Sequence, residues 1–271
     1  NRWYFAEVLS AVEAVLNVAG MDLLLYNLGD RAGRARFFEE LPVRKRVDAL
    51  LVASLVLSET ESDALRSLGC PIGTLGVDHD SFYSTRIDDA AAASTAVGHL
   101  LELGHRRIAL IGGDTADPMR FTPPHHRRRG YLQTLRAAGI DQDPRLEVLG
   151  YFTVDGGEAA TAELLTRPDR PSALFAESDE MAFGAIRAIR RHGLRVPADI
   201  AVIGFDDQAA ASLLDLSTIR QPVGEQAAEL TGRLLAAVGA TAQADAAASR
   251  SHVLGTELVV RGSTDPDASV Y

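Results

Sequence analysis

The chain has 271 residues, of which 46% are hydrophobic and 24% are charged, and its formal net charge is −10. This length suffices to bury a substantial core, and the composition is that of an average globular protein. No apolar run approaches the roughly 20 residues that span a bilayer, which argues against a membrane protein. Because proteins neutralise duplex DNA with basic faces, so acidic a chain is not expected to bind DNA by itself.

Helix-like and strand-like segments alternate from the first residues onward. Residues 2–18 carry apolar side chains at helical spacing, and Gly20 is a suitable helix end. Residues 22–26 and 49–53 are apolar runs of strand length, with a helix predicted between them at 31–40. Residues 239–250 are predicted as a flexible surface connection. The further predicted helices are 59–68, 89–103, 130–138, 156–165, 180–192 and 224–238, and the further predicted strands are 71–75, 85–87, 107–111, 147–150, 173–176, 200–204 and 257–260.

Regular alternation of helices with continuous apolar strands predicts parallel sheets that are covered on both faces. About nine strands are many for one open sheet but suit two Rossmann-like sheets side by side. The fold class is therefore predicted as α/β. Ligands of such sheets bind beyond the carboxyl ends of the strands, so the polar residues that follow each strand are the first candidates for function.

The single cysteine and the first residues bear on the cellular compartment. Cys70 has no second cysteine to pair with, which fits a reducing cytoplasm. The chain begins at Asn1 with no initiator methionine and no signal-peptide pattern, and it is interpreted as a fragment of a cytoplasmic protein. The adjacent His125 and His126 have no third ligand at metal-binding spacing, so neither a metal nor another cofactor is expected.

Several strings, spread over essentially the whole chain, occur in a characteristic order. They are WYFAE (3–7), RVDALLV (46–52), HLLELGHRRIA (99–109), Arg127 with Gly130 and Tyr131, DRPSALFA (169–176), GLRVPADI (193–200), VIGFDD (202–207), STIRQP (217–222) and TELVVRGS (256–263). Together they resemble the effector-binding core of the LacI/GalR bacterial transcription regulators.

The resemblance implies a periplasmic-binding-protein type I-like core with two lobes, a ligand cleft between them and three chain crossings. By its pattern the N-terminal lobe holds residues 1–114 and 222–248, and the C-terminal lobe holds 115–221 and 249–271. The helix-turn-helix head and hinge helix of the family are absent from the given chain. The first strand of the N-terminal sheet is also expected to precede residue 1.

The resemblance implies an aromatic contribution to the ligand site from both lobes. Tyr4 and Phe5 are placed at the cleft from the N-terminal lobe, where Trp3 could share their role, and Phe152 is placed there from the C-terminal lobe. Aromatic faces suit the apolar side of a sugar-like or nucleobase-like effector. For Phe5, ordinary core packing is an equal alternative. The loop Phe-Thr-Pro-Pro-His-His at 121–126 departs from the family pattern towards a stiffer, more apolar rim.

The polar candidates are an arginine and three residues that follow strands. Arg127 can donate paired hydrogen bonds to hydroxyls or a carboxylate, and Asp206 can accept hydroxyl hydrogen bonds. Ser178 matches a position where many relatives carry a ligand-contacting asparagine, with Asp179 interpreted as the cap of the next helix. Asp88 matches a polar contact of the first lobe. The alternative for Asp88, or for its neighbour Asp89, is a helix N-cap, and Asp207 is predicted to point away from the ligand.

The favoured function is the effector-sensing and dimerising core of a LacI-type repressor. Its expected partners are a small effector, by default a sugar or sugar derivative, a second copy of the chain in a homodimer, and operator DNA only through the missing head; no membrane partner is expected. The alternative is a periplasmic sugar-binding protein of an ABC transporter, which shares the architecture. An enzyme is not expected, because no dinucleotide fingerprint, phosphate loop or nucleophile elbow is present in the sequence.

Overall fold

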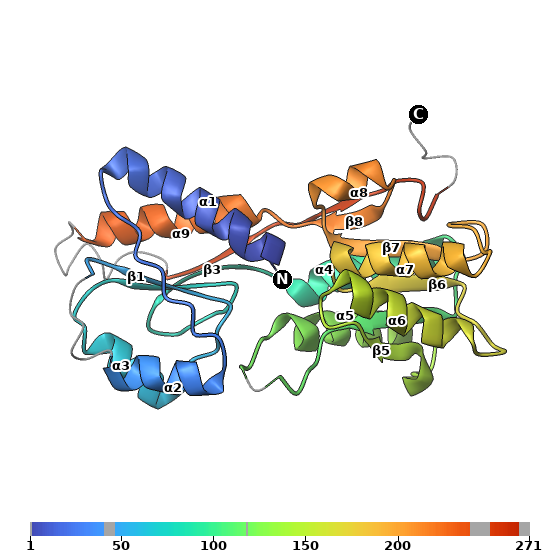
Figure 1. Cartoon of the computed structure of the whole chain (residues 1–271), viewed down its shortest axis with the longest axis horizontal. Coiled ribbons are helices and arrows are strands. Elements are labelled where there is room, and N and C mark those ends of the chain that lie inside the picture. The colour runs from blue at the N-terminus through green and yellow to red at the C-terminus, as the bar shows by residue number, and fades with distance from the viewer. Residues whose placement is uncertain (1, 41–46, 118, 239–249, 266–271) are drawn as a thin grey trace.

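The computed structural model describes residues 2–40, 47–117, 119–238 and 250–265, and these residues form two α/β lobes (Figure 1). The first lobe contains a four-stranded sheet with the order β1-β2-β3-β9, and the second a six-stranded sheet with the order β10-β8-β7-β6-β4-β5. Every neighbouring pair is parallel except β10 with β8. The α/β fold class predicted from the sequence is confirmed.

The sheet of the first lobe is covered on both faces. Its strands are β1 (Leu50–Ala53), β2 (Ile72–Leu75), β3 (Tyr83–Ile87) and β9 (Ser251–Leu254). Helices α1 (Arg2–Ala19) and α9 (Val223–Val238) pack on one face around Val8, Leu75 and Leu230. Helices α2 (Arg31–Glu40) and α3 (Glu59–Arg66) lie on the other face, around Leu65 and Ile72.

The second lobe is built in the same way around a larger sheet. Ile111 and Leu174 belong to the core under helices α6 and α7, whereas Leu110 and Phe175 belong to the core under α4 and α5. Successive residues of one strand thus enter opposite cores, as the strand period of two requires. The helices are α4 (Asp89–Glu102), α5 (Pro123–Ala137), α6 (Val154–Leu165), α7 (Asp179–Arg191) and the short α8 (Ala209–Leu213). The strands are β4 (Ile108–Gly112), β5 (Glu147–Leu149), β6 (Ala173–Ala176), β7 (Ala201–Asp206), β8 (Ser217–Arg220) and β10 (Glu257–Val259), and a 3-10 turn spans Pro144–Leu146.

The chain crosses between the two sheets three times. It leaves the first lobe after β3 and enters α4, returns from β8 to α9, and passes from β9 back to β10. In Figure 1 these crossings run through the middle and upper part of the view, while α2, α3 and the loop before α5 lie below them. No helix among the described residues is both long and apolar enough to cross a bilayer.

Two of the expected lobe boundaries are wrong. Residues 89–114 were expected in the first lobe, but β4 pairs with β5 and β6, and α4 packs against α5, so this segment belongs to the second lobe. Residues 249–271 were expected in the second lobe, but β9 pairs with β3 of the first. Local periodicity predicts a strand, but it carries no information about the sheet in which that strand finds its neighbours.

Two expected elements also differ. Residues 22–26 have no ladder partner among the described residues, and Leu23, Leu24 and Leu25 are exposed instead of forming a strand. Helix α5 begins at Pro123, seven residues earlier than expected, because proline is well tolerated in the first turn, where backbone N–H groups lack helical partners. The predicted connection at 239–250 lies outside the described residues except for residue 250.

Close packing of α4 on α5 depends on Gly130. A Cβ atom at this position would lie 2.2 Å from the carbonyl oxygen of Ala90, whereas a Cβ at Gly98 of α4 would meet nothing within 4 Å. We therefore expect Gly130→Ala to lower the free energy of unfolding by about 1–3 kcal/mol. Gly98→Ala, the matched control, is expected to raise it by about 0.5–1 kcal/mol through helix propensity. Urea unfolding measures both, and equal effects would contradict this account.

Candidate functional site

The candidate residues gather where the two lobes meet. Because β4, β5, β6 and β7 are parallel, their carboxyl ends lie on one edge of the sheet. Phe152, Ser178 and Asp206 follow or end three of these strands. From the first lobe, α1 begins beside this edge (Figure 1). Its Tyr4 lies close enough to the second lobe for the charges of Arg127 and Asp206 to act on the pKa of its hydroxyl. Tyr4, Arg127 and Asp206 are thus brought together from both lobes.

Arg127 is a buried cation on α5. It is 5% exposed, its Nε donates to Oδ1 of Asp89 at 2.8 Å, and its Nη1 donates to the backbone carbonyl of Glu177. Its guanidinium carbon lies 3.5 Å from the ring centroid of Phe205, a cation–π contact. No acceptor for Nη2 is found among the described residues. The guanidinium is therefore held rigidly through its Nε and Nη1 groups.

Asp206 ends β7 in an unusual backbone conformation. Its φ is +123°, a value that side-chain-bearing residues rarely adopt, and such strain concentrates at functional sites. Gln221 donates its Nε2 to Oδ1 of Asp206 at 2.5 Å, and Gln208 donates its Nε2 to Oδ2 at 3.4 Å. Burial raises the pKa of Asp206 to about 6, and the nearby charge of Arg127 opposes that rise. Both oxygens of the carboxyl group accept hydrogen bonds in this arrangement.

The aromatic candidates form two edge-to-face pairs. The rings of Tyr4 and Phe5 are 5.4 Å apart, and those of Phe121 and Phe152 are 5.5 Å apart. Phe5 is 44% exposed, so the core-packing alternative for it is wrong, while burial raises the pKa of Tyr4 to about 12. Phe152 has a φ of +54° and presses on Gly113, where a Cβ atom would lie only 2.1 Å from its ring. Glycine at 113 is therefore a condition for the position of Phe152.

Ser178 and Asp88 serve as helix caps. Oγ of Ser178 accepts from the backbone N–H of Met181 at 3.3 Å, and the residue is fully buried. Oδ1 of Asp88 accepts from the N–H groups of Ala90 and Ala91. The cap alternative for Asp88 is thus confirmed, and the assignment of the cap of α7 to Asp179 is wrong, because Ser178 takes that role. Both residues stand between a strand and a helix, where the first N–H groups need acceptors.

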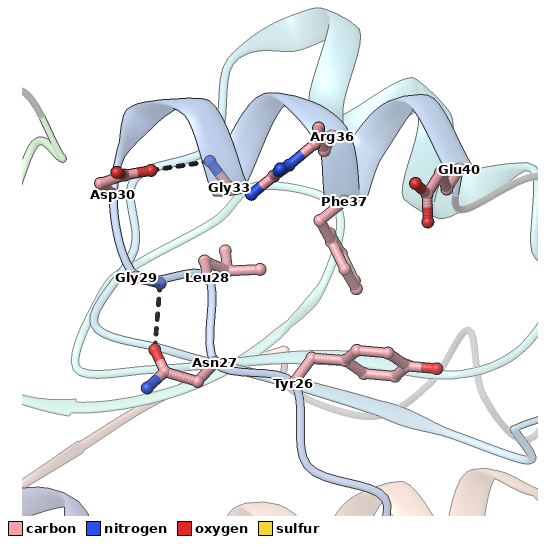
Figure 2. Close-up of a pocket in the computed structure, with 9 residues that line it drawn as sticks. All are labelled: Tyr26, Asn27, Leu28, Gly29, Asp30, Gly33, Arg36, Phe37 and Glu40. Atoms are coloured by element: carbon pink, nitrogen blue, oxygen red, sulfur yellow. Dashed lines mark hydrogen bonds between the residues drawn. The ribbon is translucent and has the colours of Figure 1, made fainter.

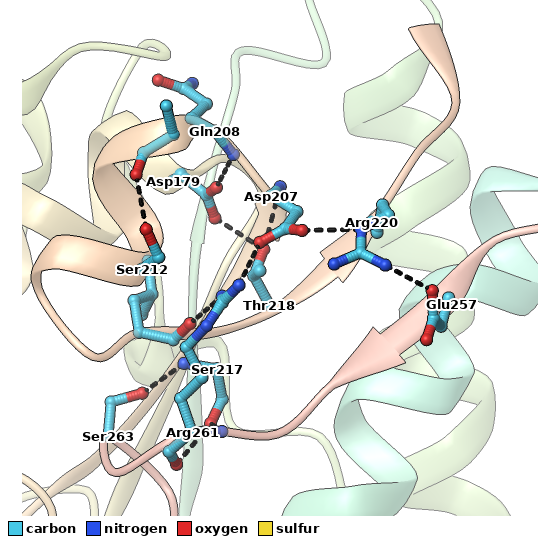
Figure 3. Close-up of polar contacts among 12 residues, drawn as sticks. Asp179, Asp207, Gln208, Ser212, Ser217, Thr218, Arg220, Glu257, Arg261 and Ser263 are labelled. Atoms are coloured by element: carbon cyan, nitrogen blue, oxygen red, sulfur yellow. Dashed lines mark hydrogen bonds and ion pairs between the residues drawn. The ribbon is translucent and has the colours of Figure 1, made fainter. Parts of the chain in front are cut away.

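Asp179 and Asp207 belong to a network that ties the second lobe together (Figure 3). Asp179 accepts from the hydroxyl of Thr218 at 2.6 Å, and its pKa is raised by burial and by Asp206. Asp207 points away from the site, as predicted, and its carboxylate binds Arg220 at 2.7 Å and Arg261 at 2.8 Å. These contacts join β7, β8 and the segment after β10.

Sequence reasoning missed Asp89 and Glu177. Asp89 was weighed only as a helix cap, and its partner Arg127 lies 38 positions away. Glu177 is 1% exposed, accepts from the N–H of Gly113 at 2.8 Å, and has a pKa raised by burial to about 8. It lines a cavity of about 90 Å³ together with Gly112, Arg128 and Glu147. A charged residue directly after an apolar strand was the available signal.

A larger cavity lies apart from this site. It measures about 560 Å³ and is lined only by residues between Tyr26 and Glu40 of the first lobe (Figure 2). Tyr26 and Phe37 form its aromatic wall, with ring centroids 5.2 Å apart. None of the residues predicted to bind the effector lines it.

Two α/β lobes joined by three crossings, with buried polar groups where they meet, define a two-lobed ligand-binding domain of the periplasmic-binding-protein type. The model of the periplasmic binding protein-like domain matches residues 97–264. The HTH-type transcriptional repressor CytR of Escherichia coli strain K12 is 33% identical over 265 residues, which cover 96% of this chain and 75% of CytR. The chain belongs to the LacI family of transcriptional regulators.

Solved structures agree with this assignment. The complex of the transcriptional regulator CelR with cellobiose has a TM-score of 0.82 and 31% identity, covering 96% of this chain and 79% of CelR. A LacI family regulator from Enterococcus faecium with bound ribose has a TM-score of 0.81 and 27% identity, covering 97% of this chain and 94% of that protein. The relatives are regulators, which decides against the transporter alternative.

The ion pair between Asp89 and Arg127 yields a stability prediction. Asp89→Ala leaves a buried cation without its carboxylate and is expected to lower the free energy of unfolding by about 3–5 kcal/mol. The double variant Asp89→Leu, Arg127→Met is expected to recover most of this loss, since no unpaired charge remains. Asp63→Ala is the control, because Asp63 pairs with Arg66 at an exposed site, where such pairs contribute about 0–1 kcal/mol. Urea unfolding measures all three, and an additive loss in the double variant would contradict the prediction.

Proposed function

We propose that this chain is the core of a repressor that binds a small carbohydrate effector between its two lobes. Binding changes the orientation of the lobes and so modulates operator binding by a helix-turn-helix head. A ligand shifts such an equilibrium only through contacts that differ between the two arrangements. An effector that touches Tyr4 from one lobe and Arg127 and Asp206 from the other satisfies this condition.

The observation that carries the proposal is that Arg127 and Asp206 are both buried, and that they lie close enough for the charge of Arg127 to lower the pKa of Asp206. A buried guanidinium with one unassigned donor group, Nη2, and a buried carboxylate provide a donor and an acceptor at the same edge of the sheet. Adjacent sugar hydroxyls can both donate and accept hydrogen bonds, which matches such a pair. The rings of Tyr4 and Phe152 supply apolar faces for the C–H side of a sugar ring. The cellobiose and ribose complexes of the two relatives support the carbohydrate class.

The effector class is tested by thermal unfolding with a panel of monosaccharides, disaccharides, sugar acids, polyols and purines. A ligand at 100 times its dissociation constant adds about 2.7 kcal/mol to the stability of the fold, a clear melting shift. We expect a carbohydrate to shift the wild type and Arg129→Ala, whose side chain is exposed on α5, but not Asp206→Asn. Asp206→Asn keeps the shape of the side chain but replaces one hydrogen-bond-accepting oxygen with an NH2 group.

Two outcomes would count against the proposal. An equal shift of the wild type and Asp206→Asn would remove Asp206 from the site. A shift by purines alone would replace the carbohydrate class with nucleobases.

The proposal includes a homodimer formed through first-lobe helices, because two-fold operators are read by two-fold proteins. The first lobe offers exposed apolar side chains for such an interface, with Val18 of α1 at 92% and Leu25 at 61%. In sedimentation velocity at micromolar concentration we expect a dimer. Val18→Glu is expected to weaken it roughly tenfold or more, because a charge would be desolvated in the interface.

Leu213→Glu is the matched control, since Leu213 is 85% exposed but lies in the second lobe. It is expected to leave the dimer unchanged. A strictly monomeric wild-type chain, or a loss caused by Leu213→Glu instead of Val18→Glu, would contradict the assignment of the interface.

A further inference from the structure

Arg34 of α2 makes a contact that spans the two lobes. Its Nη1 donates to the backbone carbonyl of Met119, in the loop between β4 and α5, at 3.0 Å. The side chain comes from the first lobe and the carbonyl from the second. Arg34 is 7% exposed, although it lies on a short helix whose other arginines, Arg31 and Arg36, are exposed.

The guanidinium of Arg34 is held rigidly from the side of the first lobe. Nε and Nη2 donate to the two carboxylate oxygens of Glu61 at 2.6 and 2.7 Å, a bidentate pair. Nη2 also donates to the carbonyl of Val56, just after β1, at 2.6 Å. Three of the four hydrogen bonds thus fix the group in its own lobe, and the fourth faces outward as a preorganised donor.

Glu61 is itself fixed by the capping box of α3. Oε2 of Glu61 accepts from the backbone N–H of Ser58 at 2.7 Å, and Oγ of Ser58 accepts from the N–H of Glu61. Burial alone would raise the pKa of Glu61, but its hydrogen bonds with Arg34 and Ser58 lower it overall, so the carboxylate stays ionised. The donor that crosses between the lobes is therefore anchored through two helices of the first lobe.

The accepting residue, Met119, also makes a hydrogen bond within its own lobe. The N–H of Met119 donates to Oδ1 of Asp117 at 2.7 Å, and Arg120 adopts a φ of +61°. Phe121 follows directly, and its ring packs edge-to-face on Phe152. The carbonyl held by Arg34 is thus two residues from one aromatic pair of the candidate site.

We infer that Arg34 is a latch that holds the lobes together on the side away from the three crossings and positions the loop that carries Phe121. In Figure 1 the crossings lie in the middle and upper part of the view, whereas α2 and the loop before α5, which Arg34 joins through the carbonyl of Met119, lie below. A contact opposite a hinge must break when the lobes open. The latch therefore stabilises the closed arrangement and slows exchange of anything bound between the lobes.

The role in effector exchange rests on the proposed function, but the latch itself does not, so it is tested without an effector. In a Cys70→Ser background, Thr60→Cys on α3 and Arg136→Cys on α5 provide one exposed spin-label site in each lobe. Pulsed electron resonance then measures the distribution of interlobe distances. We expect one dominant short distance for the otherwise unaltered chain, and a longer-distance population at least roughly tenfold larger for Arg34→Met, the scale of losing one hydrogen bond from a charged group.

Two further variants make the result decisive. Arg34→Lys keeps the charge opposite Glu61 but lacks the planar fork that reaches three acceptors, so it should also open the lobes. If Arg34→Met does not fold, the interlobe distances of Arg34→Lys provide the test. Arg36→Met, an exposed arginine of the same helix, should leave the distances unchanged. Folded Arg34 variants with the unaltered distance distribution would overturn the inference.

The same measurement separates the latch from the proposed function. If the interlobe distances change in the Arg34 variants but no carbohydrate binds, the role of Arg34 is supported and the effector proposal fails. If a carbohydrate binds but the distances do not depend on Arg34, the effector proposal is supported and the role of Arg34 fails.

Discussion

The buried positive charge of Arg127 is the constraint on which the second lobe depends. A cation removed from water must be paired and hydrogen-bonded, because an uncompensated buried charge costs several kcal/mol. Here the compensation comes from three elements: Asp89 at the start of α4, the carbonyl of Glu177 after β6, and the ring of Phe205 in β7. The helix that follows the first crossing is thereby fixed to the edge of the sheet where a ligand would bind. The charge of Arg127 therefore fixes both the packing of α4 on the sheet and the geometry of the candidate site.

Two consecutive aspartates connect that edge to the remaining crossings. Asp206 and Asp207 both have positive φ values, and the resulting turn sends their side chains in different directions. Asp206 accepts from Gln221, which lies in the crossing between β8 and α9. Asp207 binds Arg220, which in turn binds Glu257 at 2.7 Å at the start of β10, directly after the crossing from β9 (Figure 3). The two aspartates thus contact the segments of both remaining crossings, Asp206 through Gln221 and Asp207 through Arg220.

The sequence predicted the fold class, most elements and the main polar candidates, because these depend on local periodicity and on strings shared with a family. Arg127 and Asp206 are both buried, and the charge of Arg127 lowers the pKa of Asp206, whereas Ser178 and Asp88 cap helices. The sequence could not tell which of Asp88 and Asp89 caps α4, because the role of Asp89 depends on its ion pair with Arg127 of α5. The lobe boundary near residue 114 failed for a related reason: the strand at 108–112 was predicted, but its neighbours in the sheet were not. A single sequence does not show which distant segments pair, whether as neighbouring strands or as an ion pair.

The energies at the junction explain how so few contacts can govern a switch. To move two lobe arrangements from 1:99 to 99:1, a ligand must favour one of them by about 5.5 kcal/mol. One hydrogen bond from a charged group contributes about 1.5–3 kcal/mol, so the contact of Arg34 with Met119 alone sets a substantial part of the starting balance. An effector that bridges Tyr4 and Asp206 supplies contacts of the same kind and size. Among the described residues, the covalent crossings on one side and the guanidinium of Arg34 on the other both hold the lobes, so two or three hydrogen bonds from an effector between them would decide the balance.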